Sequence, residues 1–214
     1  MKKIILLLLA FMPLFGFAQS ESIETPAKAL SNFFKDWTKA KPEITRDDVS
    51  GKGVRWVWSS HRISKVSSKA GTNYVGVEIA GRSFKNGAEP EFLLYFRFHD
   101  TKSLKVEKND PILFKFCDDS VYEGVFTDDR EDYLGTPFTF GGHVVMTYDI
   151  YPSMVIDEAF LNSLKKGLTK MRFEINDTAY DVVLKKDNLS QFILDSYELV
   201  KQRLSEKKDF RDGF

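Results

Sequence analysis

The side chains best suited to nucleophilic or metal chemistry in this chain are three histidines and a single cysteine. His61, His99 and His143 lie far apart in the sequence, and no pair has the spacing that directs two imidazoles from one helix or strand face toward a zinc ion. Cys117 is followed by two aspartates, whose negative charge disfavours the reactive thiolate. We therefore expect ordinary histidines at the surface or at strand ends, and a buried structural cysteine.

The motifs that mark common enzyme classes are missing from the sequence. The chain contains no Gly-x-Ser-x-Gly nucleophile elbow and no glycine-rich loop of the kind that cradles phosphate. The sequence therefore assigns no catalytic residue, predicts no cofactor and favours a non-enzymatic protein. A catalytic site assembled by the fold from distant residues stays open as an alternative.

The densest acidic cluster is a candidate for hard-cation binding. Asp128, Asp129 and Asp132 lie close together, and carboxylate oxygens suit Ca²⁺. Their spacing differs from that of an EF-hand loop, and Arg130 lies among them. We expect a solvated charged loop here, with calcium binding by the three aspartates as the weaker alternative.

Aromatic residues follow in a segment rich in glycine. Tyr133, Phe138 and Phe140 lie between the acidic cluster and His143, in a stretch expected to be irregular and near the surface. Rings on a surface loop offer a large contact area at a small entropy cost, which suits contact with a glycan or a protein. These three aromatics and His143 are therefore the predicted ligand-binding residues. The alternative is that the rings fold back and extend the core.

A second aromatic pair lies on a predicted strand. Trp56 and Trp58 are two residues apart, so they share one face of that strand. We expect this face to be turned toward the core. An exposed platform for a ligand is the alternative.

Residues 1–18 have the features of a cleavable signal peptide. Two lysines supply the positive start, and Ile4–Phe17 forms an apolar run too short to cross a hydrocarbon core of about 30 Å. Gly16 and Ala18 then place small residues at the positions that a signal peptidase reads. The mature chain is expected to be residues 19–214, a single β-rich domain with no further membrane span, exported to the periplasm or secreted.

The charge balance disfavours a nucleic-acid-binding protein. The chain has 31 basic and 31 acidic residues, so it carries no net positive charge that would attract a phosphate backbone. A single cysteine also allows no intramolecular disulfide, so packing alone must stabilise the fold. In an exported protein, this cysteine usage favours the bacterial envelope over a disulfide-rich extracellular setting.

Helical periodicity appears in three places. Thr25–Pro26 resembles the N-cap and first position of an N-terminal helix. Asp157 is suited to cap a short helix that Gly167 closes. Asn188 and Gln191 resemble a capping box at the start of a longer amphipathic C-terminal helix.

Between these helices the hydrophobic period changes to two, which predicts β-strands joined by short turns. Asn176–Asp177 is a two-residue connection of the kind that favours a tight hairpin. A long irregular loop is predicted over Thr127–Gly142. The predicted strands are a segment beginning at Val54, Tyr74–Phe84, Phe92–Phe98, Ile112–Cys117, Val121–Phe126, His143–Tyr151, Thr169–Ile175 and Thr178–Leu184.

Sequential strands with short links predict an antiparallel α+β fold. We expect a β-sandwich or a strongly curved sheet of about seven or eight strands, with the N-terminal and C-terminal helices packed on it. One short helix should precede the last hairpin.

The leading functional hypothesis is an exported bacterial envelope or secreted protein that binds a protein or glycan partner through the loop Asp128–His143. One alternative is a cell-envelope hydrolase whose site assembles only in three dimensions. Another is a structural or assembly component of the envelope, which would present a broad apolar surface patch. A structure separates these alternatives, because an enzyme needs titratable side chains gathered within reach of one another.

The export prediction is tested by the mass of the protein recovered from a bacterial host that expresses the full chain. We expect the intact mass of a chain that begins at Gln19, because the cleavage signals end at Ala18. Replacing Ala18 with a bulky residue should leave the uncleaved precursor. Full-length protein recovered from the cytoplasm in both cases would contradict the signal peptide.

Overall fold

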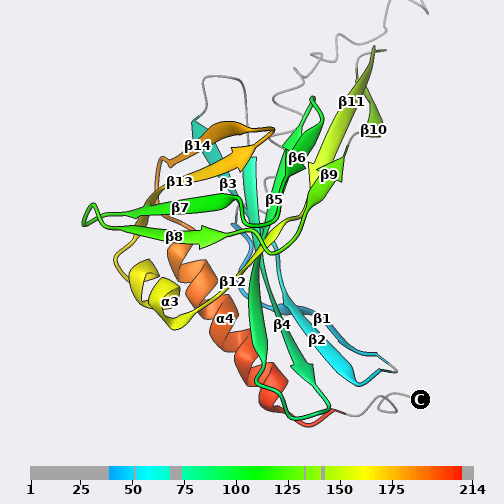
Figure 1. Cartoon of the computed structure of the whole chain (residues 1–214), viewed down its shortest axis with the longest axis vertical. Helices are drawn as coiled ribbons and strands as arrows, with labels where there is room; N and C mark the ends of the chain where they lie inside the picture. The colour runs from blue at the N-terminus through cyan, green and yellow to red at the C-terminus, as the bar shows by residue number, and fades with distance from the viewer. Residues whose placement is uncertain (1–38, 51, 68–73, 133, 141–142, 209–214) are drawn as a thin grey trace, which may run out of the picture.

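The computed structural model describes residues 39–50, 52–67, 74–132, 134–140 and 143–208 (Figure 1). The predicted signal peptide and N-terminal helix lie outside these residues. The described chain forms two helices and a set of antiparallel strands. These elements are β1 (Ile44–Val49), β2 (Val54–Ser59), β3 (Arg62–Ser67), β4 (Tyr74–Phe84), β5 (Glu91–Asp100), β6 (Leu104–Val106), β7 (Pro111–Phe116), β8 (Val121–Val125), β9 (Arg130–Asp132), β10 (Thr136–Phe140), β11 (His143–Ile150), β12 (Ser153–Val155), α3 (Glu158–Leu164), β13 (Leu168–Ile175), β14 (Thr178–Leu184) and α4 (Ser190–Ser205).

Most strands belong to one antiparallel sheet that is curled into a half-barrel. Its main path runs β10-β11-β5-β4-β3-β14-β13-β7-β8, while β2 pairs with β4 and carries β1, and β12 pairs with β5. A separate two-stranded sheet joins β6 to β9. Of the two predicted architectures, the strongly curved sheet describes this arrangement, and the sandwich is not confirmed.

The hairpins predicted from local turn chemistry are present. β4 covers Tyr74–Phe84 and pairs with β5, as the alternating pattern predicts. β13 and β14 are joined at Asn176 and Asp177, which have φ angles of 53° and 56°. Two successive left-handed residues are what a tight type I′ turn requires, and asparagine and aspartate tolerate this conformation.

The predicted number of strands is too low. The stretch Thr127–Gly142, predicted as an irregular loop, contains β9 and β10. β1 and β3 were not predicted because polar residues occupy several of their positions, so the alternation of apolar side chains is weak. β6 and β12 are three residues long, which is too short for a periodic signal.

The core lies inside the curl of the sheet. The ring of Phe173 on β13 lies 5.1 Å from Phe96 and 4.8 Å from Phe98, both on β5. In the sheet, β13 and β5 are separated by β14, β3 and β4, so these contacts require the sheet to fold toward itself. Phe114, Phe126 and many aliphatic side chains complete the same cluster.

The C-terminal helix packs on the inner face of β4 and β2 (Figure 1). A Cβ at Gly81 would lie 2.6 Å from Leu204 Cδ1 and 2.7 Å from Val200 Cγ1, so the glycine allows α4 to approach the sheet closely. Neither helix in the described part of the chain is long and apolar enough to cross a bilayer.

The predicted start of α3 is confirmed, whereas the predicted cap of α4 is wrong. Asp157 caps α3, and its Oδ1 accepts a hydrogen bond from Phe160 N at 2.7 Å, as expected. The capping box predicted at Asn188 is wrong, because the Asn188 side chain accepts a bond from Ser64. Asp187 accepts from the first amides of α4 in its place.

A buried ion cluster fixes the end of α4 to the β1–β2 hairpin. The Asp47 carboxylate on β1 accepts two hydrogen bonds from Arg55, at 2.9 and 3.0 Å, and one from Arg203 at 2.8 Å. Lys208 lies 3.3 Å from the same carboxylate. Burial opposes the charge on Asp47, but these bonds outweigh it and lower its pKa to about 2. We call Asp47, Arg55, Arg203 and Lys208 the Asp47 cluster.

The Asp47 cluster predicts a strong contrast between two neighbouring aspartates. Asp47→Asn should lower the free energy of unfolding by about 3 kcal/mol at pH 7, because Arg55 would stay buried without its counter-charge. Asp48→Asn should cost less than about 0.5 kcal/mol, because the Asp48 side chain is 62% exposed and pairs only with Arg46. Urea denaturation of both variants checks this.

The pH dependence gives a second readout of the same pair. The pKa of Asp47 is about 2 in the folded state, below its ordinary value of 3.8, so its stabilisation is complete above about pH 4. It is lost as the pH falls through about 2. The difference in the free energy of unfolding between wild type and Asp47→Asn should therefore become smaller in acid. Equal stability of the two aspartate variants at pH 7 would contradict the role of the cluster.

Candidate functional site

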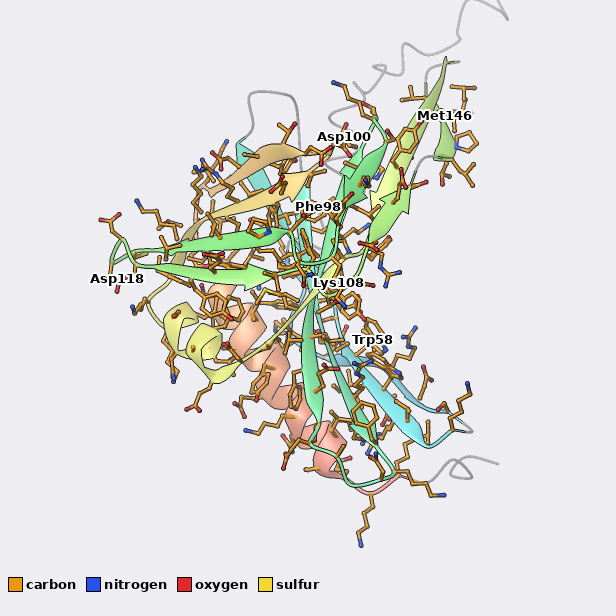
Figure 2. The ribbon with its side chains drawn as sticks, in the orientation of Figure 1. Trp58, Phe98, Asp100, Lys108, Asp118 and Met146 are labelled. Carbon is orange, nitrogen blue, oxygen red and sulfur yellow. The ribbon has the colours of Figure 1, made fainter. Side chains whose placement is uncertain are left out.

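The segment predicted to contact a ligand forms a projecting two-stranded arm. Every residue of β10 pairs with β11, whereas only Tyr148–Ile150 of β11 pair with β5. The rest of the hairpin extends beyond the main sheet, with Met146 well away from the core ring of Phe98 (Figures 1 and 2). We call the described residues of this hairpin, 136–140 and 143–147, the β10–β11 arm.

The arm exposes apolar side chains. Val144 is 67% exposed, and Val145 and Met146 are also exposed. Leu134, just before the arm, is exposed too. Val144 and Met146 lie on one face of β11 and Val145 on the other, because successive strand residues point to opposite faces. Single exposed apolar residues are ordinary on protein surfaces, but a projecting hairpin with exposed apolar side chains on both faces is of the kind that marks interaction sites.

The predicted ligand-binding residues fall on or beside this arm. Phe138 lies on β10 opposite Val145, and Phe140 lies opposite His143 at the end of the hairpin. The side chains of these three residues, Phe138, Phe140 and His143, are outside the described part of the structure, and so is the whole of Tyr133. Their backbone positions place three of the four predicted residues on one hairpin.

The acidic cluster anchors the base of the arm. The Asp132 carboxylate accepts hydrogen bonds from the amides of Gly135 and Asp149, both at 3.0 Å, and these bonds lower its pKa. Asp128 pairs with Arg130. Among the described residues no group of three or more His, Cys, Asp or Glu side chains is placed to hold a metal ion.

Asp129, the third predicted calcium ligand, accepts a hydrogen bond from the amide of Lys108 at 2.7 Å. Each of the three aspartates therefore has a partner within the protein. The calcium hypothesis receives no support from the described side chains.

The tryptophan pair lies on the outer face of the sheet, so the predicted core-facing orientation is wrong. On β2, Arg55, Val57 and Ser59 are buried on the inner face, and Trp56 and Trp58 alternate with them. Both indoles are half-buried and belong to no part of the core cluster. The period of two was read correctly, but it does not say which face is covered.

The outer face carries a row of rings and guanidinium groups. The rings of Trp56 and Trp58 stack with centroids 5.7 Å apart, and Tyr95 lies 4.9 Å from Trp58. Arg46 lies 4.5 Å above the Trp58 ring, and Arg82 lies 5.3 Å from the Trp56 ring. These cation–π contacts hold the indoles without covering them completely.

A half-buried carboxyl lies next to this row. Glu78 pairs with Tyr95 across the β4–β5 ladder, and its carboxyl group forms no hydrogen bond with another described residue. Burial raises its pKa to about 7, although Arg46 and Arg97 act in the opposite direction. A carboxyl with this pKa can take up or release a proton near neutral pH.

Two histidines belong to the same outer face. His99 Nδ1 and Arg97 Nε each lie 3.1 Å from the Asp149 carboxylate, on the neighbouring strand. His61 packs over Gly76, where an added Cβ would lie 2.3 Å from its Nε2. Burial, with the charge of Arg97, lowers the pKa of His61 to about 4 and keeps its imidazole neutral.

Sequence reasoning missed much of this outer-face cluster. Glu78, Arg97 and Asp149 come from three strands, and no motif joins them. Their only signal in the sequence is that polar residues occupy the outward positions of β4 and β5. Once the register is known, Glu78 and Arg97 lie on the same face as the tryptophans.

The cysteine prediction is wrong. Cys117 is exposed, directly after β7, and its Sγ would lie 3.1 Å from a Cβ at Gly167. The apolar Phe116 precedes it, but the strand ends at that residue and the Cys117 side chain is not enclosed. The structure gives no hydrogen bond between Cys117 and either His61 or the acidic cluster, so among the described residues these groups do not meet at Cys117 to form a hydrolase site.

Compared with models of protein families, with curated proteins and with solved structures, this chain matches none. The functional argument therefore depends on the geometry of its own residues.

The protonation state of Glu78 predicts how the free energy of unfolding changes with pH. The folded-state pKa of about 7 lies above the ordinary 4.5, so the folded state binds more protons and stability is lost as the pH rises through this interval. Glu78→Gln removes this loss. At pH 8 the variant should be more stable than wild type by about 1 to 2 kcal/mol, after allowance for partial solvent screening.

The two proteins should become equally stable near pH 4, where Glu78 is protonated. Thermal or urea denaturation across this pH range measures the difference. Glu123→Gln on β8 is the matched control, because Glu123 is exposed and has no hydrogen bond to another described residue. Equal stability of wild type and Glu78→Gln at pH 8 would contradict the prediction, because it would mean that ionisation of Glu78 does not lower the free energy of unfolding.

Proposed function

We propose that this chain is an exported bacterial envelope protein, periplasmic or secreted, that binds a protein partner through the β10–β11 arm. The observation that carries the proposal is the exposure of Val144, Val145 and Met146 on the two faces of the projecting hairpin. Its fixed base, where Asp132 bonds to the amide of Asp149, adds support, because an anchored arm loses less entropy on binding. No catalytic step is required of the protein.

The chemistry of the arm favours a protein over a glycan as the partner. Its exposed apolar side chains Val144, Val145 and Met146 are aliphatic or thioether groups, which bury well against another apolar surface. Its described exposed hydroxyl side chains are those of Thr136 and Thr139. A glycan site needs several convergent polar groups as well as rings. The partner is therefore expected to present an apolar groove or patch.

The binding mode should be side-chain docking, without the addition of a strand to the sheet. β10 is the terminal strand of the main sheet path, and its edge is where a partner strand would pair. Pro137 occupies this edge strand and has no amide hydrogen to donate. A proline at a sheet edge is a known barrier to such pairing.

An envelope hydrolase is the second candidate, and the outer-face cluster favours it. On one face of the sheet, burial raises the pKa of Glu78, whereas bonds from His99 and Arg97 outweigh burial and lower the pKa of Asp149, a pattern also seen in acid–base sites. A screen of chromogenic ester and glycoside substrates tests it. Turnover that Glu78→Gln abolishes, while Glu123→Gln retains it, would replace the binding proposal. A purely structural role in the envelope is the third alternative.

A photo-reactive amino acid placed at position 144 tests the arm directly in the bacterium that makes the protein. We expect one discrete crosslinked species, because Val144 lies at the centre of the proposed contact. The matched control is position 121 on β8, where Val121 is 59% exposed but lies far from the arm along the sheet. This position should give no such species.

A second variant separates specific contact from chance collisions. Adding Met146→Ser to the position-144 probe should reduce the crosslinked species by about tenfold, because a buried apolar anchor contributes 1 to 3 kcal/mol. Val125→Ser, on β8, should leave it unchanged. Identical crosslinking from positions 144 and 121, or none from 144, would contradict the proposal.

A further inference from the structure

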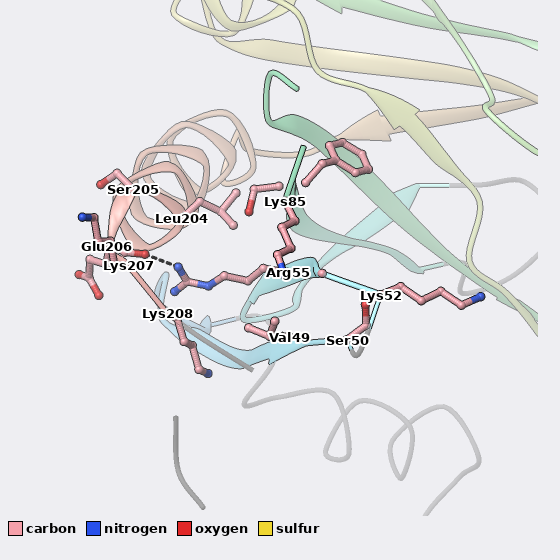
Figure 3. A pocket seen from close by; sticks show the side chains of 13 residues that line it. Val49, Ser50, Lys52, Arg55, Lys85, Leu204, Ser205, Glu206, Lys207 and Lys208 are labelled. Atoms are coloured by element: carbon pink, nitrogen blue, oxygen red, sulfur yellow. Dashed lines mark hydrogen bonds between the residues drawn. The ribbon is translucent and has the colours of Figure 1, made fainter. Parts of the chain in front are cut away.

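A cavity of about 730 Å³ lies between the β1–β2 turn, the end of β4 and the end of α4 (Figure 3). This volume lies in the range of small-molecule sites. The cavity is at the opposite end of β4 from its pairing with β3, and remote along the sheet from the β10–β11 arm. Its walls include Lys52, Arg55, Phe84, Lys85, Leu204 and Lys207.

Three segments far apart in the sequence each contribute an uncompensated lysine to this cavity. Lys52 comes from the β1–β2 turn, Lys85 follows β4, and Lys207 follows α4. No ammonium group of the three forms an ion pair or hydrogen bond with another described residue. Figure 3 shows Lys52 and Lys207 at opposite sides of the cavity, so an anion bound between them would attract both.

The other charges at the cavity are already balanced. Arg55 and Lys208 are committed to the Asp47 carboxylate, and the Glu206 carboxylate pairs with Arg203. Arg55 also donates to the backbone carbonyl of Glu206, at the end of α4. This bond offsets the partial negative charge that a helix C-terminus would otherwise present to an anion.

The turn that carries Lys52 is built to approach Lys85. Gly53 has a φ of 76°, and a Cβ there would lie 2.8 Å from the Cβ of Lys85. Lys85 also donates its backbone amide to Gly53 O at 3.0 Å. A glycine is therefore required both for the backbone conformation and for the close approach of the two lysine-bearing segments.

We propose that this cavity binds a small organic polyanion of the phosphate-ester class, with at least two negative charges. Lysines act as point charges toward phosphate. The whole chain is electrically neutral by its formal charges, so the three lysines are a local concentration and do not reflect a generally basic protein. Phe84 and Leu204 provide apolar wall for the carbon part of such a ligand. The site is independent of the proposed arm function.

Calorimetric titration of the mature protein with sodium tripolyphosphate at low salt tests the site. We expect saturable binding that weakens as salt is added, because these exposed charges are screened. Lys52→Gln, Lys85→Gln and Lys207→Gln should each lower the association constant by about 3-fold to 10-fold, and the triple variant should abolish binding. Lys186→Gln, in the segment between β14 and α4, is the control and should bind as wild type.

Citrate and lipid vesicles define the ligand chemistry further. Citrate should bind at least about threefold more weakly than tripolyphosphate, because each carboxylate group carries less negative charge than a phosphate group. Vesicles containing phosphatidic acid, compared with phosphatidylcholine alone, distinguish a lipid headgroup from a free phosphate ester. Binding to phosphatidic acid that tripolyphosphate displaces identifies the headgroup as the source, and binding of tripolyphosphate without vesicle binding identifies a free ligand.

Two results would overturn the proposal. One is the absence of tripolyphosphate binding to the wild-type protein at millimolar concentration and low salt. The other is equal binding by the triple variant and wild type, provided that both give the same urea midpoint. Because all three lysines are exposed, their replacement should leave the fold intact, so a loss of binding reports on the site itself.

Discussion

The contact of Phe96 and Phe98 with Phe173 is the constraint on which the rest of this structure depends. These rings come from β5 and β13, which the sheet separates by three intervening strands, and they meet at 5.1 and 4.8 Å. An antiparallel sheet can bring such strands together only by curling. With a single cysteine in the chain, no intramolecular disulfide can hold the curl, so ring packing and aliphatic burial must do so. The side of the sheet that becomes inner is fixed by this packing.

The curl also decides where the polar groups lie. On the inner face, α4 packs on β4 and β2, and the Asp47 carboxylate there is surrounded by the three cationic side chains of the Asp47 cluster. On the outer face Glu78 has no comparable partner, and its raised pKa follows from that difference. The Asp47 carboxylate on β1 and the Glu78 carboxyl on β4 therefore have opposite electrostatic states, although only β2 separates their strands. The first stabilises the fold, and the second leaves a group that can change its charge near neutral pH.

The proposed functional surfaces lie where the sheet ends. The β10–β11 arm extends past the last residues that pair with β5, and the lysine-lined cavity lies at the far ends of β2 and β4. Neither surface disturbs the packed interior, because each is built from turns and strand ends. This separation allows a protein partner at the arm and a small anion at the cavity to bind without competing for the same residues.

The sequence by itself determined the local elements whose signals are short-range. The alternation in β4, the turn at Asn176 and Asp177, and the Asp157 cap of α3 depend on neighbours within a few residues, so they were predictable. The strand from His143 was predicted, but Phe138 and Phe140 were expected in an irregular loop and instead lie on β10, which pairs with that strand. Tertiary structure alone decided that the tryptophans face outward, because a period of two defines two faces without saying which is covered. It alone brought Lys52, Lys85 and Lys207 to one cavity, because long-range packing sets the distance between segments that no sequence spacing joins.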